Sequence, residues 1–342
     1  MKLFRSSLLV FASLSFAMQA KACDLCACYT PNGDIVPDKP TAFYLSVAEQ
    51  FTHFGSLRDG GHEVHNEVDQ YLNSSITQLV LGADLINDKL TLQLNVPFIY
   101  RSFKRPEGFA IDKGSVGGLG DLSLLLNYQL FKFESGAQAA AQPSAKGAKA
   151  VTLPASGGAE FSTSLNLIAG LKFPTGNSDR IGEELEEHEI AGAPESGIHG
   201  HDLTLGTGSW DGVFGVQSFT RYKAFFVEAD LQYTVRSSGR FGYRFANDLT
   251  WAAGPGVYLH REGSNSIALQ CALSGESKGK DRFRGESADD TGITSMFIGP
   301  RLLATRGNFS GEVGFDLPLI LHNTALQAVP DYRIRAGLTF RF

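Results

Sequence analysis

The sequence has no internal apolar run long enough to cross a membrane as a helix, which needs about 20 predominantly apolar residues. Its clearest apolar run, Leu8–Ala17, covers ten residues near the N-terminus. Lys2 and Arg5 precede this run, and Ala20-Lys21-Ala22 follows with small residues at the positions that a signal peptidase reads. We therefore interpret residues 1–22 as a cleaved secretory signal, which predicts an exported protein.

Strong basic charge is also missing. The chain carries 30 Lys and Arg against 36 Asp and Glu, a formal net charge of −6. The signal segment holds three cations and no acids, so the mature chain carries −6 − 3 = −9. Nucleic-acid-binding domains present a basic patch or stripe. This composition therefore argues against a nucleic acid as partner.

Cysteine is scarce, and three of the four cysteines fall within six residues, as Cys23, Cys26 and Cys28. Thiolates at this C-x-x-C-x-C spacing can bind Zn or Cu. Haem attachment needs His directly after the second Cys, and position 27 is Ala. A disulfide in an oxidising compartment is the main alternative. A lipid anchor on Cys23 is weaker, because Lys21 places a charge where that signal needs small or apolar residues.

Proline is concentrated behind these cysteines. Pro31, Pro37 and Pro40 make residues 23–40 unsuited to a sheet strand. We interpret the segment as a periplasmic extension, or as a small plug in the mouth of the domain that follows. Apart from a metal at its cysteines, the sequence indicates no cofactor.

What the sequence does contain is period-two alternation, clearest in its last eleven residues. Side chains of a strand point alternately to its two faces. One face here is wholly apolar, and the other carries Arg333, Arg335 and Arg341. The stretch resembles the closing strand of bacterial outer-membrane proteins, and that resemblance implies recognition by the barrel assembly machinery. The residues to which it gives this role are Tyr332, Phe340 and Phe342.

About twelve segments alternate in this way. Membrane-crossing strands of a β-barrel need roughly 9–11 residues, apolar toward lipid and polar toward the interior. The sequence therefore predicts an all-β fold, an antiparallel transmembrane β-barrel of about twelve strands over residues 41–342. Two of the strands meet at a tight turn around residues 222–223. The others are expected near 41–54, 68–86, 89–103, 119–133, 160–174, 244–260, 266–274, 293–305, 308–318 and 331–342.

The connections alternate in length. Short turns are expected near residues 87–88, 222–223, 261–265 and 306–308. Long loops are expected near residues 55–67, 104–118, 175–207, 237–243, 275–292 and 319–330. Outer-membrane barrels have short periplasmic turns and long outer loops, so the pattern predicts that fold and an outer-membrane location. The Ala/Ser/Gly/Pro-rich linker at 135–157 breaks the rule.

Charged residues on the polar faces are predicted to share one interior. Buried charges must be paired or hydrated, so they form either an ion-paired core or a wet path. The predicted interior residues are Lys172, Glu228, Asp230, Arg236, Glu312, Asp316, Arg333, Arg335 and Arg341.

Histidines gather in two of the expected outer loops. His62 and His65 lie in the first loop, and His199 and His201 lie in the third, beside the acidic run at 183–189. Imidazoles and carboxylates can bind a divalent cation. The alternative is an ordinary solvated acidic loop.

Three glycine-rich motifs carry a family resemblance. They are Gly118-Leu119-Gly120-Asp121, the run Gly170 to Gly176, and Gly206-Thr207-Gly208-Ser209. Over residues 118–235 the chain resembles outer-membrane proteins of the MetA pathway of phenol degradation, distant relatives of the long-chain fatty-acid channel class. The resemblance implies a barrel that admits small or hydrophobic molecules. It implies no catalytic residues.

Together these features predict a passive outer-membrane channel for small solutes, including hydrophobic or metal-associated ones. The alternative is a structural or binding barrel whose cysteine segment holds a metal or a periplasmic partner. A barrel hydrolase is not expected, because the chain has no His-x-Ser-Asn sequence. The expected partners are membrane lipid, the assembly machinery and a small solute, and the oligomeric state is left open.

Overall fold

The structure, a computed structural model, describes residues 43–86, 89–135, 160–185 and 190–342. The predicted signal and the cysteine segment lie outside these residues. One antiparallel sheet of fourteen strands closes on itself through β17 and β1. Two of its members, β2 (His62–Val64) and β5 (Ala110–Leu119), only extend the wall at one end. The remaining 14 − 2 = 12 strands form the barrel, which confirms the predicted fold.

The barrel strands follow one another around the wall in chain order. They are β1 (Phe43–Asp59), β3 (Tyr71–Ile86), β4 (Leu90–Glu107), β6 (Ser123–Ser135), β7 (Phe161–Lys172), β8 (Asp211–Tyr222), β9 (Phe225–Val235), β11 (Asp248–Glu262), β12 (Asn265–Lys278), β15 (Ile293–Arg306), β16 (Phe309–Asn323) and β17 (Gln327–Arg341).

Alternation decides which side of the wall each residue faces. On β4, the outward Phe98 and Tyr100 are 49% and 55% exposed, whereas the inward Gln93 and Asn95 are each 2% exposed. The exposed face is apolar and the buried face is polar, the reverse of a water-soluble protein. A transmembrane barrel has this arrangement, because lipid contacts its outer face. Within the described residues, no helix is long and apolar enough to cross a membrane.

The seam of the barrel joins its first and last strands. β1 and β17 pair from Tyr44, opposite Arg341, to Arg58, opposite Gln327. Inside this seam, the hydroxyl oxygens of Ser46 and Thr339 lie 2.7 Å apart, both groups being buried. The closed ring leaves no unpaired edge among the barrel strands, which removes the exposed backbone groups that lipid cannot satisfy.

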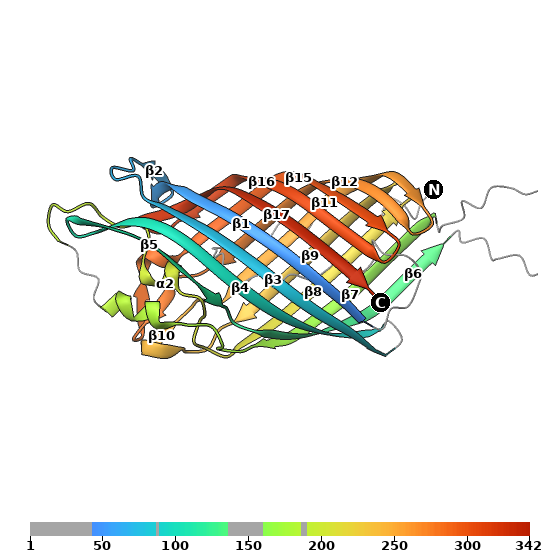
Figure 1. The fold of residues 1–342 in the computed structure, drawn as a ribbon, viewed down its shortest axis with the longest axis horizontal. Helices are drawn as coiled ribbons and strands as arrows, with labels where there is room; N and C mark the ends of the chain where they lie inside the picture. The colour runs from blue at the N-terminus through green and yellow to red at the C-terminus, as the bar shows by residue number, and fades with distance from the viewer. Residues whose placement is uncertain (1–42, 87–88, 136–159, 186–189) are drawn as a thin grey trace, which may run out of the picture.

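The two ends of the barrel differ. β2, β5, α2 (Gly200–Leu203) and β10 (Tyr243–Arg244) cluster at the end opposite the C-terminus, which we call the loop end (Figure 1). A second, three-stranded sheet joins β10 to β13 (Asp281–Phe283) and β14 (Glu286–Ala288) there. Tight turns join strands at the other end, with Gly307 at φ 59° between β15 and β16.

Four of the predicted long loops contain more strand than expected. Residues 55–67 include the end of β1 and all of β2. Residues 104–118 are largely a hairpin, because β4 runs to Glu107, turns at Gly108 (φ 59°) and returns as β5. Residues 319–330 are largely the ends of β16 and β17, and residues 275–292 include β13 and β14. Charged residues interrupt the apolar alternation at 104–118 and 275–292, and polar residues such as Asn323 and Thr324 interrupt it at 319–330, so the sequence pattern was lost before the strand pairing ended.

Candidate functional site

The nine charged residues predicted to face the interior occupy inward positions, at strand ends and along the wall. Lys172, Glu228, Asp316, Arg333 and Arg341 are each less than 8% exposed. The side chains of the others are half-buried or buried: Asp230, Arg236, Glu312 and Arg335. Inward charge is densest on the strands from β9 round to β17.

Several of these charges pair across the interior rather than along the wall. Arg301 on β15 forms an ion pair with Glu312 on the adjacent β16, and its other nitrogen lies 3.6 Å from Glu228 on β9. β12 and β11 separate β15 from β9 in the wall. The guanidinium group of Arg301 therefore bridges strands that are not neighbours, and it narrows the interior between them.

A second bridge crosses the interior nearer the loop end. Arg333 on β17 lies 3.6 Å from Glu276 on β12, and its guanidinium group stacks 4.2 Å from the centroid of the Phe297 ring. Arg335 pairs with Asp316 on the neighbouring strand at 2.8 Å. Sequence reasoning missed Arg301 and Glu276. Arg301 shares the period-two face of Ser295 and could have been found, whereas Glu276 lay in a stretch expected to be a loop.

The three glycine-rich motifs meet at one place, where β6, β7 and β8 reach the loop end. The carboxylate of Asp121 accepts hydrogen bonds from the backbone N–H of Gly176 at 3.0 Å and from the N–H and hydroxyl of Thr207 at 2.8 Å each. A Cβ on Gly206 would lie 2.5 Å from that carboxylate. The motifs therefore fasten the β7–β8 loop to the start of β6.

A buried ion-pair triad continues this cluster. Arg236 donates to Asp211 at 2.6 Å and to Asp248 at 2.7 Å, and all three side chains are at most 1% exposed. Ser209 also donates to Asp211, at 2.7 Å. Buried charges of this kind tie strand ends together only while every partner is present. Arg236 thus anchors the ends of β8, β9 and β11.

The β7–β8 loop is not the solvated acidic loop that the sequence suggested as an alternative, in the part that the structure describes. Ile198 and Leu203 are fully buried and pack with Phe54, Leu72 and Phe103 from the barrel wall. This apolar cluster outweighs the polar composition of the loop, because burying apolar side chains stabilises by about 1.5–3 kcal/mol each.

Hydrogen bonds from the wall hold the same loop in place. Arg101 on β4 donates to the carbonyl oxygens of Asp202 and Thr204, the latter at 2.9 Å. Three strands along the wall from β4, the Ala328 N–H on β17 donates to the Gly197 carbonyl at 2.7 Å. The loop therefore lies against the neighbouring strands β4, β3, β1 and β17 at the loop end of the barrel. We call residues 190–207 the cap loop.

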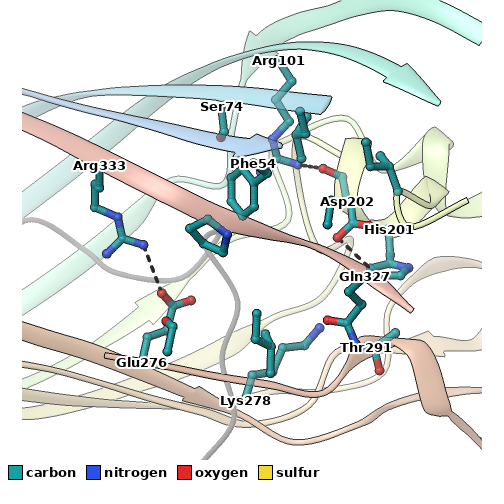
Figure 2. Close-up of a pocket in the computed structure, with 17 residues that line it drawn as sticks. Phe54, Ser74, Arg101, His201, Asp202, Glu276, Lys278, Thr291, Gln327 and Arg333 are labelled. Carbon is teal, nitrogen blue, oxygen red and sulfur yellow. Dashed lines mark hydrogen bonds and ion pairs between the residues drawn. The ribbon is translucent and has the colours of Figure 1, made fainter. Parts of the chain in front are cut away.

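A cavity of about 70 Å³ lies beneath the cap loop. Figure 2 shows Phe54, Arg101 and Ser74 on one side, Arg333 and Glu276 on another, and His201 and Asp202 of the cap loop beside Gln327. The lining is part apolar and part charged. Such a volume holds a few water molecules or a small polar group.

The histidines of the cap loop contact carboxylates. His199 Nε2 lies 3.5 Å from Asp290 Oδ2, and His201 Nε2 lies 3.4 Å from Asp202 Oδ1. The two imidazole rings stack with centroids 5.7 Å apart. Burial opposes ionisation of Asp202, but the adjacent imidazoles of His201 and His199 and the His199 N–H outweigh it, so the pKa of Asp202 is lowered.

The structure tests the loop histidines as metal ligands but not the N-terminal cysteines. In the described ranges, no group of three or more His, Cys, Asp or Glu side chains is arranged to hold a metal ion. His62 lies on β2 and His65 just beyond it, apart from the pair formed by His199 and His201. Cys23, Cys26 and Cys28 lie outside the described residues, so metal binding there stays a prediction. Cys271, on the outward face of β12, is a free thiol.

The aromatic residues proposed as an assembly signal all point outward at the seam. Phe342 stacks on Phe43 with ring centroids 6.4 Å apart, and Phe340 contacts Phe309 at 4.6 Å. Tyr332 lies near the other end of β17. The contacts show an aromatic cluster at the turn end of the seam, and recognition by assembly machinery stays a prediction.

The closed twelve-strand ring with an apolar exterior defines this chain as an antiparallel β-barrel of the transmembrane type. A scan against protein-family models finds no match, and a search of curated proteins finds no relative. The resemblance to the MetA-pathway family is therefore not confirmed.

Solved structures give further comparisons. An outer-membrane channel from Pseudomonas putida F1 superposes with a TM-score of 0.56 at 16% identity, over 92% of this chain and 100% of that chain. The β domain of the Bordetella autotransporter BrkA gives 0.45 at 11% identity, over 87% and 99%. The Pseudomonas putida toluene transporter TodX gives 0.39 at 9% identity, over 94% and 96%. The first comparison supports the barrel fold, and we draw nothing from the other two.

Proposed function

We propose that this barrel spans the outer membrane of a Gram-negative bacterium and passes small solutes through its interior. The observation that carries the proposal is the inverted wall, with exposed apolar side chains outside and charged side chains inside. Leu231 and Leu338 are 44% and 56% exposed, whereas Glu228 and Arg333 are at most 7% exposed. Water-soluble proteins do not expose so continuous an apolar belt. The fold shared with an outer-membrane channel supports the same proposal.

The bridges inside the barrel limit what passes. Arg301 and Arg333 each reach a carboxylate on a strand that is not their neighbour, and the cap loop covers part of the loop end. A solute must fit beside these bridges, so the proposal concerns small molecules. The mixed apolar and charged lining beneath the cap loop suits solutes that carry both characters.

Reconstitution in planar lipid bilayers tests the proposal. We expect discrete current steps from the intact protein. We expect larger steps from an Asp202→Asn variant, which loses the charge through which the cap loop is attracted to Lys278 on β12. Glu195→Gln, an exposed change in the same loop, is the matched control. If neither the intact protein nor the Asp202→Asn variant passes current or radiolabelled solute, the channel proposal fails.

The second candidate is a binding barrel, in which Cys23, Cys26 and Cys28 hold a metal or a periplasmic partner. The cap loop favours it, because a covered interior suits a barrel that does not conduct. Near-stoichiometric Zn or Cu by elemental analysis, lost in a Cys26→Ser, Cys28→Ser double variant, would support it. Two titratable thiols from four cysteines in unfolded, metal-free protein would instead indicate a disulfide.

A further inference from the structure

Glu49 places a carboxyl group on the outer face of the barrel wall, which is mostly apolar. It lies on β1 two residues after Val47, which is 45% exposed and faces outward, so Glu49 shares that face. Its partners also face outward. Ser75 and Thr77 on β3 each donate a hydroxyl hydrogen bond to one of its carboxylate oxygens at 2.5 Å. The carboxyl group is therefore fixed on the outside of the barrel.

The position of Glu49 along the strand places it within the lipid-facing belt. Phe43 marks the turn end of the belt, where it stacks on Phe342. Phe51 and Tyr332 mark the other side, with ring centroids 6.1 Å apart. Barrels carry aromatic girdles at both membrane interfaces. Glu49 falls between these two aromatic contacts, at the depth of hydrocarbon.

A carboxyl group at that depth is costly, and such groups mark functional sites. Outward positions on other strands are occupied by apolar side chains, as at Val313 on β16, Leu231 on β9 and Leu302 on β15. Ser75 and Thr77 lower the cost of burying Glu49, but each carboxylate oxygen accepts only one of these hydrogen bonds and has the capacity for another. The site calls for a further hydrogen-bonding partner from outside the barrel.

The surroundings of Glu49 form a shallow notch. Its direct neighbours across the sheet are Ala336 on β17 and Thr77 on β3, both small. Large exposed side chains rim the notch, among them Leu338 at 56% and Phe98 at 49%. Small residues with a hydrogen-bonding group between them allow close approach of two membrane-embedded surfaces.

We propose that the Glu49 notch is the contact face of a homodimer within the membrane. Two copies in one membrane are related by an axis along the membrane normal, so a residue beside that axis meets its own counterpart at the same depth. Two carboxyl groups brought together can share one proton, which gives each the missing partner. A second copy therefore matches the notch in depth and in chemistry, and the small floor lets the two walls meet.

Cysteine cross-linking tests the proposal without disturbing Glu49. The background has Cys23, Cys26, Cys28 and Cys271 replaced by Ser. Ala336→Cys, beside Glu49, is the reporter, and Leu231→Cys on β9 is the control. After oxidation in phosphatidylcholine vesicles, we expect a band of doubled mass for the reporter and none for the control. Equal cross-linking at the two positions would overturn the proposal.

Changes at Glu49 in the reporter background give the second arm. Glu49→Leu removes the hydrogen-bonding group, and we expect loss of the doubled band. Glu49→Gln keeps a group that donates and accepts, and we expect the band to persist. Heat-modifiable gel mobility checks that every variant has formed a barrel. A doubled band that survives Glu49→Leu would refute the role of this residue. The experiment scores association only, so its outcome is separate from that of the current measurements.

Discussion

Arg301 and Glu228 lie on opposite sides of two intervening strands, yet their charged groups approach to 3.6 Å inside the barrel. The same arginine also satisfies Glu312. One cation therefore balances two inward carboxylates in the interior. Its removal changes both the charge and the width of that region.

Arg301→Gln is expected to make the barrel more selective for cations. Glu228 and Glu312 keep their charges without the guanidinium group, and the interior potential becomes more negative. The reversal potential in a salt gradient across a planar bilayer measures the change. Arg261→Gln, an exposed change near the β11–β12 turn, is the control and should leave the selectivity unchanged. A channel with the same selectivity in both variants would show that ions do not pass near Arg301.

Arg236→Met should destabilise the barrel by about 3–5 kcal/mol, because it leaves Asp211 and Asp248 buried without their cation. Urea unfolding in detergent micelles, followed by heat-modifiable gel mobility, measures the loss. Arg240→Met is the comparison, since Arg240 pairs with Asp179 at the surface, where ion pairs contribute about 0–1 kcal/mol. Similar losses in the two variants would mean that the triad contributes no more than a surface pair.

The period-two pattern predicted the barrel, because one set of alternate residues must meet lipid. The pattern predicted that Arg236 faces inward, but it did not predict its partners. Asp211 and Asp248 lie beside Arg236 only because of the way β8, β9 and β11 align. The cap loop has no periodicity, and its acidic neighbours suggested a solvated loop. The burial of Ile198 could not be read from such a stretch. Glu49 lay within a predicted strand, and its parity with Val47 could have revealed its outward position.

Leu338→Lys tests the in/out register of the last strand. Leu338 is 56% exposed and lies between the outward aromatic residues Tyr332 and Phe342, so a charge there should cost about 2–4 kcal/mol near the bilayer midplane. The folded, heat-modifiable fraction should fall in membranes. Thr339→Val, on the inward face, should insert normally. A one-residue slip would exchange the two faces, and normal insertion of Leu338→Lys with failure of Thr339→Val would reveal it.

Phe342→Ser is expected to act on biogenesis rather than on the finished barrel. The amount assembled in cells should fall, because the assembly machinery loses the aromatic residue that the closing strand presents. Refolding of the purified variant into detergent should match that of the unaltered protein. Phe309→Ser removes a partner of the same aromatic cluster and serves as control. Equal deficits of Phe342→Ser in cells and in detergent would indicate a structural role instead.

The cap loop should open in acid only at a low pH. The pKa of Asp202 is lowered, so its contribution is present above its ordinary value of 3.8 and is lost only as pH falls through the lower folded value. Labelling of a Leu203→Cys thiol by 4,4′-dithiodipyridine, which reacts with thiols in acid as well as at neutral pH, reports opening, with the four native cysteines replaced by Ser. We expect protection from pH 7 to below pH 4, and faster labelling at all these values for Asp202→Asn. Loss of protection well above pH 4 would show that groups other than Asp202 keep the cap loop closed.

The seam between β1 and β17 has a consequence for the order of events in folding. Ser46 and Thr339 meet across a separation of 293 residues along the chain. Every other pairing in the ring joins two of the twelve barrel strands that follow one another along the chain. Hairpins can therefore form as the chain arrives, but the cylinder stays an open sheet until its last strand is delivered. A shortened chain lacking β17 would keep two unpaired edges, so it would be an aggregation hazard and not a smaller pore.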